Sequence, residues 1–306
     1  MDLSIIVVSY NTRDLTLGCI RSIYKETRDI SFEVIVVDNA SSDGSADALE
    51  AEFPSMRLVR SSSNDGFAAA NNQAAEIASG SQLLLLNPDT IVLDGAVQKL
   101  VQFARDNRNF AIFGGRTIFE DGSLNPESCW RRPTLWSTLC SATGLSSFLR
   151  GSVLFDSESY GHWQRDSVRE VDIVSGCFFL ISKKLWDELG GFDTEYFMYG
   201  EEADLCLRAR HMGHKAVIFP GAVIVHHGGR SESVPGDKLV RLLRSKNLLI
   251  QRHWRSPMAR IGSAMLKFWV LTRRIYWGLR TLLAQKTAIP KAAMYKDVWM
   301  RRSEWT

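Results

Sequence analysis

The stretch LLLLNPDT at residues 83–90 constrains the fold more than any other part of the chain. Four consecutive leucines predict a strand buried on both faces, because a strand with one face in solvent would alternate apolar and polar residues. Proline cannot donate a hydrogen bond to a sheet, so Pro88 ends this strand. The side chains of Asn87 and Asp89 therefore lie just beyond the carboxyl end of a core strand, where ligands bind in open α/β sheets.

Asp89 has two interpretations on this stretch. With Asn87 it is well placed to hold a divalent cation on a phosphorylated substrate. Alternatively, Asp89 or Thr90 caps the amino end of the helix that we expect over residues 94–106. Both interpretations remain open from these residues alone.

Strands and helices are predicted to alternate along the first third of the chain. This alternation predicts βαβ units, and hence an α/β fold with a Rossmann-like, doubly wound, mostly parallel sheet and helices on both faces. Residues 110–170 give the weakest pattern. The expected strands are 3–8, 33–37, 56–60, 83–86, 110–115, 178–181 and 216–225, and the expected helices are 14–25, 45–53, 65–79, 94–106, 182–189 and 258–285.

Polar residues follow three of these strands, and strand ends of one parallel sheet share an edge. Asp38 can accept a hydrogen bond from the imide N–H of uracil or thymine, although a role as a turn former is the alternative. No GxGxxG or Walker A motif follows the first strand, which removes the main sequence support for ordinary dinucleotide or NTPase sites. The polar strand ends are Tyr10-Asn11, Asp38-Asn39 and Asn87-Asp89.

Three acids, Glu201, Glu202 and Asp204, begin a predicted helix after the sequence FMYG. Acids in a first helical turn complement the helix dipole, which is the simpler explanation. Three of them within four residues exceed that need. Crowded like charges raise one another's pKa, which suits a general base.

Five motifs occur in order over about 200 residues: SIIVVSYN, VVDNASSDGS, NDGFAAANN, LLLLNPDT and GGFDTEYFMYGEEADLCLRARHMG. Together they resemble the inverting family 2 glycosyltransferases of the GT-A fold, and especially their rhamnosyltransferase-like branch. The resemblance covers residues 3 to roughly 232. It implies a nucleotide-diphosphate sugar donor, a divalent metal, Mg²⁺ or Mn²⁺, and an acceptor hydroxyl.

The resemblance also implies roles for individual residues. The family's acidic pair falls on Glu201-Glu202, with Glu202 as the expected base and Glu201 as the second choice. The metal motif falls on Asn87-Pro88-Asp89, where an amide replaces the first carboxylate, so Asp89 should make the charged contact. The nucleotide-sugar site falls on Ser9, Tyr10, Asn11, Asp38, Asn39, Gly66, Phe67, Asn71, Asn87 and Arg208.

Two adjacent histidines, His226 and His227, follow the last predicted strand. A histidine here resembles the family's late metal ligand. Neighbouring side chains of a strand point to opposite faces, so at most one of the two should bind metal. We expect that one to be His226, and a structural histidine is the alternative for either.

The chain divides by charge into a catalytic domain at residues 1–235 and a C-terminal region at 236–306. Residues 238–306 hold sixteen Lys and Arg, two acids and five of the nine tryptophans, giving a net charge of +14. Ile261, Met265, Phe268, Ile275, Leu279 and Leu282 recur at helical spacing, and Arg260, Lys267 and Arg274 lie on another face. This pattern predicts a basic amphipathic helix at an anionic membrane surface, and packing on the catalytic domain is the alternative.

We therefore expect an inverting glycosyltransferase that moves a sugar, with rhamnose the first choice, from a dTDP- or UDP-sugar to a lipid-linked saccharide in cell-surface polysaccharide synthesis. No signal peptide is evident and the five cysteines form no CxxC pair, so we expect a cytoplasmic protein that is peripheral on the inner face of the membrane. The competing hypotheses are a nucleotidyltransferase, which lacks its glycine-rich loop here, and a non-catalytic nucleic-acid-binding protein, for which no known binding module is evident.

Overall fold

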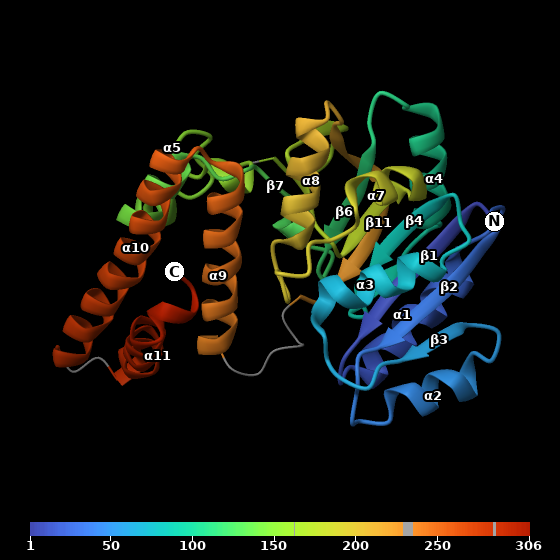
Figure 1. Cartoon of the computed structure of the whole chain (residues 1–306), viewed down its shortest axis with the longest axis horizontal. Coiled ribbons are helices and arrows are strands. Elements are labelled where there is room, and N and C mark those ends of the chain that lie inside the picture. The colour runs from blue at the N-terminus through green and yellow to red at the C-terminus, as the bar shows by residue number, and fades with distance from the viewer. Residues whose placement is uncertain (162, 229–234, 284–285) are drawn as a thin grey trace. The chain divides into compact units, whose positions relative to one another are not determined.

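The computed structural model describes residues 1–161, 163–228, 235–283 and 286–306 (Figure 1). The chain forms two compact units, each built from segments that are distant in sequence. The first comprises Met1–Trp130 and Trp163–Ser231, and the second comprises Arg131–His162 and Glu232–Thr306. Residues 131–162, which the sequence pattern leaves in the catalytic domain, therefore group with the C-terminal helices.

The first unit is built on a nine-stranded sheet, counted over the described residues, in the order β3-β2-β1-β4-β10-β6-β11-β5 with β8 paired to β11. Neighbours among β3, β2, β1 and β4 are parallel, whereas β10 is antiparallel to both β4 and β6. The fold is thus the mostly parallel α/β sheet that was expected. Its strands are β1 (Leu3–Ser9), β2 (Phe32–Asp38), β3 (Arg57–Arg60), β4 (Gln82–Leu86), β5 (Thr90–Val92), β6 (Ile112–Ile118), β8 (Arg169–Val171), β10 (Phe178–Ser182) and β11 (Ala216–His226).

Helices pack on both faces of this sheet (Figure 1). On one face α1, α2 and α4 cover the side chains of alternate strand residues. On the other, aromatic rings join β10 to the region of α7, with Phe179 and Trp186 both in contact with Phe192. The helices are α1 (Arg13–Glu26), α2 (Ser45–Glu52), α3 (Gly66–Ile77), α4 (Ala96–Asp106), α7 (Lys183–Leu189) and α8 (Glu201–His211).

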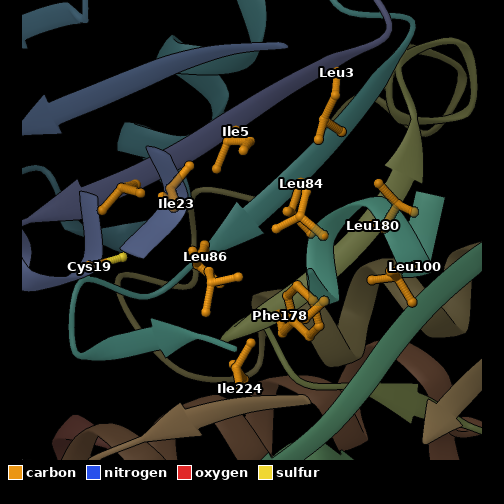
Figure 2. Packing of buried hydrophobic residues seen from close by; sticks show 14 of the residues in the cluster. Leu3, Ile5, Cys19, Ile23, Leu84, Leu86, Leu100, Phe178, Leu180 and Ile224 are labelled. Carbon is orange, nitrogen blue, oxygen red and sulfur yellow. The ribbon is translucent and has the colours of Figure 1, made fainter. Parts of the chain in front are cut away.

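The four leucines 83–86 are at most 1% exposed, which confirms the strand buried on both faces. Figure 2 shows Leu84 and Leu86 of β4 beside Ile5 of β1 and Phe178 of β10 in the main core. At roughly 25 cal/mol per Å² of apolar area, such complete burial stabilises the fold by about 1.5–3 kcal/mol per leucine. Burial on both faces therefore places this strand in the interior of the sheet.

The chain after β4 forms a strand where a loop was expected. Residues Thr90–Val92 form β5, which pairs antiparallel with β11, and α4 begins at Ala96 with Gly95 as its N-cap. The interpretation of Asp89 or Thr90 as a helix cap is therefore wrong. The helix expected over residues 182–189 is confirmed as α7: the Ser182 hydroxyl caps its start by accepting a hydrogen bond from the Leu185 N–H, and Gly190 ends it in a left-handed conformation.

The second unit is helical and has its own core. The α10 side chain Arg273 donates hydrogen bonds to the carbonyls of Ser141 and Ala142, both at 2.9 Å, and so fixes α5 to α10. Trp305 is buried and its indole N–H donates to the carbonyl of Val298. None of the described helices is long and apolar enough to cross a membrane. The helices are α5 (Leu135–Thr143), α6 (Leu145–Phe148), α9 (Pro235–His253), α10 (Ser256–Leu282) and α11 (Ile289–Met300).

Candidate active site

Strand pairing brings the polar ends of β1, β2 and β4 to one edge of the sheet. Ser9 is paired in register with Asp38, and Val7 is paired with Leu86. The N–H of Asn39 donates to the Ser9 carbonyl at 2.8 Å, so the turns after β1 and β2 stay joined beyond the strands. In a parallel sheet this carboxyl edge is the usual position of a bound nucleotide.

Asp38 carries an acceptor without a partner at this edge. Its side chain is buried, and Oδ2 accepts a hydrogen bond from the Ser41 N–H at 3.1 Å. Oδ1 is also buried and, within the described residues, meets no donor. A buried carboxylate oxygen without a donor is costly, so a ligand N–H that reached it would be bound favourably.

The turn after β1 is held by its own side chains. Asn11 has a left-handed backbone, with φ of 52°, and its Oδ1 accepts from the Ser42 N–H at 2.8 Å. The Ser9 hydroxyl is buried and lies 2.9 Å from the Thr16 hydroxyl, so Ser9 shapes the turn from within. Tyr10 is 43% exposed, so its ring lies open to solvent in this turn.

The glycine at the start of α3 makes a close backbone contact with the FMYG segment. Gly66 has φ of +88°, and a Cβ atom there would lie 2.3 Å from the carbonyl oxygen of Phe197. The next residue, Phe67, donates its N–H to that same oxygen at 2.8 Å. Asn39 donates to the carbonyl of Gly66, and the buried Asn71 donates to that of Phe67. These four residues, which were predicted to bind the sugar donor, therefore also position the segment that leads to the acid pair.

Asp89 and His226 meet at the end of β4. Because β5 pairs with β11, His226 is in register with Thr90, and its Nε2 lies 3.4 Å from the Asp89 carboxylate. Burial disfavours the charged form of both groups, but their pairing has the larger effect. The hydrogen bond with His226 lowers the pKa of Asp89. The neighbouring Cys177 and Asp89 raise the pKa of His226 to about 11. The Asn87 amide nitrogen is 3.5 Å from the same Nε2.

His227 points elsewhere, as its Nδ1 lies 3.0 Å from the Glu120 carboxylate. The described residues contain no cluster of three or more His, Cys, Asp or Glu side chains that could enclose a metal. Asp89 and His226 still suit a divalent cation that takes its other ligands from a diphosphate, because Mg²⁺ is commonly held by one or two carboxylates and substrate phosphates. The buried Nδ1 of His226 has no hydrogen-bond partner among the described residues.

The acid pair begins α8. Glu201 is buried, and burial together with the adjacent Glu202 raises its pKa well above the usual range for a glutamate. Glu202 is partly exposed. Burial raises its pKa, whereas the Gly200 N–H, which donates to its carboxylate at 3.2 Å, lowers it. Of the two carboxylates, Glu202 is therefore the one that an acceptor can reach.

Two consecutive residues connect the acid pair with the Asp89 region. A Cβ atom at Gly176 would lie 3.4 Å from the Phe67 ring and 3.9 Å from Cβ of Glu202. The carbonyl of the next residue, Cys177, accepts a hydrogen bond from the Asn87 N–H at 3.2 Å. The start of β10 thus lies between the two groups, which places both at one end of the sheet.

Arg208, predicted for the nucleotide-sugar site, is held by three protein groups. Its Nε lies 2.6 Å from the buried Asp204 carboxylate, and its two terminal nitrogens donate to the carbonyls of Leu189 and Gly191. All three nitrogens thus have protein partners, and together they tie α8 to the end of α7. These contacts give Arg208 a structural role, and its part in nucleotide-sugar binding stays a prediction.

Comparison with known proteins agrees with this geometry. The family model for glycosyl transferase family 2 matches residues 4–189, more than half of the chain. The chain belongs to glycosyltransferase family 2. A family relative, the N-acetylglucosaminyl-diphospho-decaprenol L-rhamnosyltransferase of Mycobacterium tuberculosis, is 28% identical over 74% of this chain and 78% of its own length. The O-antigen biosynthesis protein RfbC of Myxococcus xanthus is 29% identical over 76% of this chain, which is 18% of that protein.

Solved glycosyltransferase structures share the fold. The mannosyltransferase PcManGT from Pyrobaculum calidifontis, solved with GDP-Man and Mn²⁺, has a TM-score of 0.57 and 18% identity, covering 97% of this chain and 84% of that one. Residues 1–349 of S. aureus TarS with UDP-GlcNAc have a TM-score of 0.55 and 14% identity, covering 99% and 92%. At these identities the similarity establishes the fold alone, and the chain is a glycosyltransferase through its family.

Some residues of this family 2 site escape sequence reasoning. Asn125 is fully buried and donates its side-chain N–H to the carbonyl of His226 at 3.1 Å. Phe197 supplies the carbonyl that holds α3, and Asn64 accepts from the Asn39 amide at 2.8 Å. Asn125 lies in the stretch with the weakest pattern. A backbone carbonyl such as that of Phe197 is present in every residue, so the sequence does not indicate its role. For Asn64 the sequence did carry a signal, because it directly precedes the Asp-Gly pair at residues 65–66.

Gly66→Ala should lower turnover, because the new Cβ would collide with the Phe197 carbonyl and displace the segment before Glu202. We expect a loss of about 1–3 kcal/mol of stability and a fall in kcat that exceeds the change in donor affinity. Gly213→Ala is the matched control, since Gly213 also has φ of +88° but no atom within 4 Å of the added Cβ. Kinetics and thermal unfolding of both variants measure this. Equal effects in the two variants would show that the contact between Gly66 and the Phe197 carbonyl does not contribute to turnover.

Glu201→Gln should stabilise the protein at neutral pH. A group whose pKa is raised in the folded state has its full stability below the unfolded pKa and loses stability as pH rises through the folded value. The free-energy difference between Glu201→Gln and wild type should therefore be smallest near pH 4 and grow toward neutral pH. Denaturant unfolding across this pH range tests the sign, and a difference that is constant with pH would show that Glu201 is ionised without cost.

Proposed function

We propose that this family 2 enzyme transfers a sugar with inversion from a dTDP- or UDP-sugar to a hydroxyl of a lipid-linked saccharide, in the synthesis of a cell-surface polysaccharide. The observation that supports the proposal is that Gly176 lies beside Glu202, while the next residue, Cys177, accepts a hydrogen bond from Asn87, two residues before Asp89. This supports a site in which the partly exposed Glu202 acts together with Asp89 and His226. Inverting transfer needs two groups: a base that takes the proton of the acceptor hydroxyl, and a group that stabilises the leaving diphosphate.

The nucleotide would bind at the ends of β1 and β2. The free Oδ1 of Asp38 would accept the imide N–H of uracil or thymine, and the exposed ring of Tyr10 would cover the base. Asn11 and Asn39 would hold the two turns in place through the hydrogen bonds that they already make. This arrangement supports a pyrimidine nucleotide with an N–H at the position that Asp38 faces.

The diphosphate would lie beside Asp89. We propose that Asp89 and His226, with Asn87 as a neutral neighbour, hold Mg²⁺ or Mn²⁺ together with the donor. Such an ion would neutralise the charge that develops on the leaving diphosphate. Metal affinity without the donor should be weak, because one carboxylate and one imidazole leave most of the ligands to the diphosphate.

Glu202 would act as the general base. Its carboxylate would accept the proton of the acceptor hydroxyl as that oxygen attacks the anomeric carbon from the face opposite the diphosphate. The bond from that carbon to the diphosphate oxygen breaks, so no covalent enzyme intermediate forms. The raised pKa of Glu202 strengthens it as a base at neutral pH.

The sugar and acceptor classes follow from relatives. The Mycobacterium tuberculosis relative is named as a rhamnosyltransferase acting on a diphospho-decaprenol saccharide. We therefore propose rhamnose from dTDP-rhamnose as the first donor to test and a lipid-linked saccharide as the acceptor. An acceptor of this kind confines the reaction to a membrane surface, so the enzyme would work as a peripheral protein on the cytoplasmic face.

Glu202→Gln should lower turnover by about 10²–10⁴-fold, because general-base assistance is worth that much, and leave donor affinity near the wild-type value. Glu201→Gln is the matched comparison, expected to keep most of the turnover. Single-turnover transfer with radiolabelled dTDP-rhamnose and UDP-sugars, alongside calorimetric donor binding, measures both effects. A normal rate in Glu202→Gln with a collapse in Glu201→Gln would exchange the two roles.

The variants Asp38→Asn and Asp89→Asn should distinguish recognition of the nucleobase by Asp38 from binding of the metal by Asp89. Replacing the Asp38 acceptor should weaken dTDP and UDP binding about tenfold with or without Mn²⁺, as expected for one charged hydrogen bond. Asp89→Asn should leave metal-free binding unchanged and remove the gain in affinity that Mn²⁺ brings. Calorimetry with and without Mn²⁺ tests both, and a Mn²⁺ gain that survives Asp89→Asn would place the ion elsewhere.

A further inference from the structure

The long helix α10 presents two opposite apolar faces. One packs in the core of the second unit through Ala259, Gly262, Leu266 and Val270, beside α9, α11 and α5 (Figure 1). At about 100° per residue, five exposed apolar side chains of α10 fall within about 60° of one another and about 180° from the buried ones. The described residues of the second unit leave these five exposed, and they are Ile261, Phe268, Ile275, Leu279 and Leu282.

A second exposed apolar group lies in the turn after α6. Phe148 is 87% exposed, Val153 68% and Leu154 58%. The turn is nevertheless ordered by hydrogen bonds: Trp136 donates its indole N–H to the Leu154 carbonyl, and the Gly151 N–H donates to Asp156. Its supporting helix, α5, is fixed to α10 by Arg273. Large apolar side chains held outward on a fixed support mark an interaction surface.

The second unit carries a strong positive charge. Its two segments hold nineteen Lys and Arg against six Asp and Glu, a net charge of +13. Arg260 and Lys267 lie on α10 beside its exposed apolar residues, and no described acidic side chain is within ion-pair distance of either. Near the end of α10, Arg280 and Lys291 lie over the ring of Trp277. Tryptophan and basic residues bordering an apolar face are typical of proteins at a membrane interface.

We propose that the second unit docks on anionic lipid bilayers through a docking face formed by the five exposed α10 residues and by Phe148, Val153 and Leu154. The apolar side chains would enter the acyl region while the bordering cations meet the lipid headgroups. A second copy of the chain is a poorer partner, because two units of charge +13 repel each other. Nucleic acid would satisfy the cations but leave the apolar side chains uncovered.

Co-sedimentation with vesicles tests the docking face with the full-length protein. We expect binding to phosphatidylglycerol vesicles, little binding to phosphatidylcholine vesicles, and release from the former as salt rises. Phe148→Glu with Leu154→Glu should lower the partition coefficient about tenfold or more, because each change removes a large apolar contact. Leu279→Glu with Leu282→Glu should do the same from the helix side. Val168→Glu, at a 51% exposed apolar residue of the first unit, is the matched control and should bind as wild type.

Circular dichroism and nucleotide binding show first that each variant is folded. The inference does not depend on the proposed reaction, since vesicle binding needs no donor and nucleotide binding needs no membrane. Retained nucleotide binding with lost vesicle binding supports the docking face even where no transfer is detected. Wild-type-like vesicle binding by both folded double variants, or no binding of the intact protein to anionic vesicles, would overturn it. So would a dimer that these variants convert to monomers without any change in vesicle binding.

Discussion

The site depends on the burial of β4 on both faces. A one-residue slip of that strand would not expose a polar face, but it would move Pro88 and Asp89 out of step with β1 and β10, which are fixed by their own buried residues. The chain then returns as β5 and pairs with β11, so the pairing of Thr90 with His226 brings Asp89 and His226 together. The same pairing turns His227 toward Glu120, since neighbouring side chains point to opposite faces.

A second constraint joins the two halves of the site. The Phe197 carbonyl, the Phe67 N–H and the missing Cβ of Gly66 form a backbone contact between α3 and the segment before α8. Asn72 strengthens it with two hydrogen bonds to the backbone of Phe192, both 2.8 Å. The segment that delivers Glu202 is thereby held on α3, whose first residue accepts a hydrogen bond from Asn39 in the turn after β2. The proposed role of Glu202 needs this, because a base displaced by about 1 Å can lose much of its effect.

The sequence was most informative where burial and capping leave a local signature. Leu83–Leu86, the caps Ser182 and Gly190, and the polar strand ends could all be predicted, because each follows from residue types within a few positions. Strand β5 could not, since three residues give no period and its partner, β11, lies more than 120 residues away. The grouping of residues 131–162 with the C-terminal helices rests on long-range contacts such as Arg273 with Ala142. Arg208 matched a motif, but two of its three partners, the carbonyls of Leu189 and Gly191, were invisible in sequence.

The start of α8 shows what the acid pair costs. Tyr199 and Gly200 both have left-handed backbones, with φ of 71° and 91°, and for the tyrosine this is strained. The helix N-terminus favours carboxylates, yet burial outweighs that effect and raises the pKa of both glutamates. A chain selected for stability alone would place neutral residues here. The strain and the buried carboxylates coincide at a pair that lies near both α3 and the start of β10, which is where a base of raised pKa would be useful.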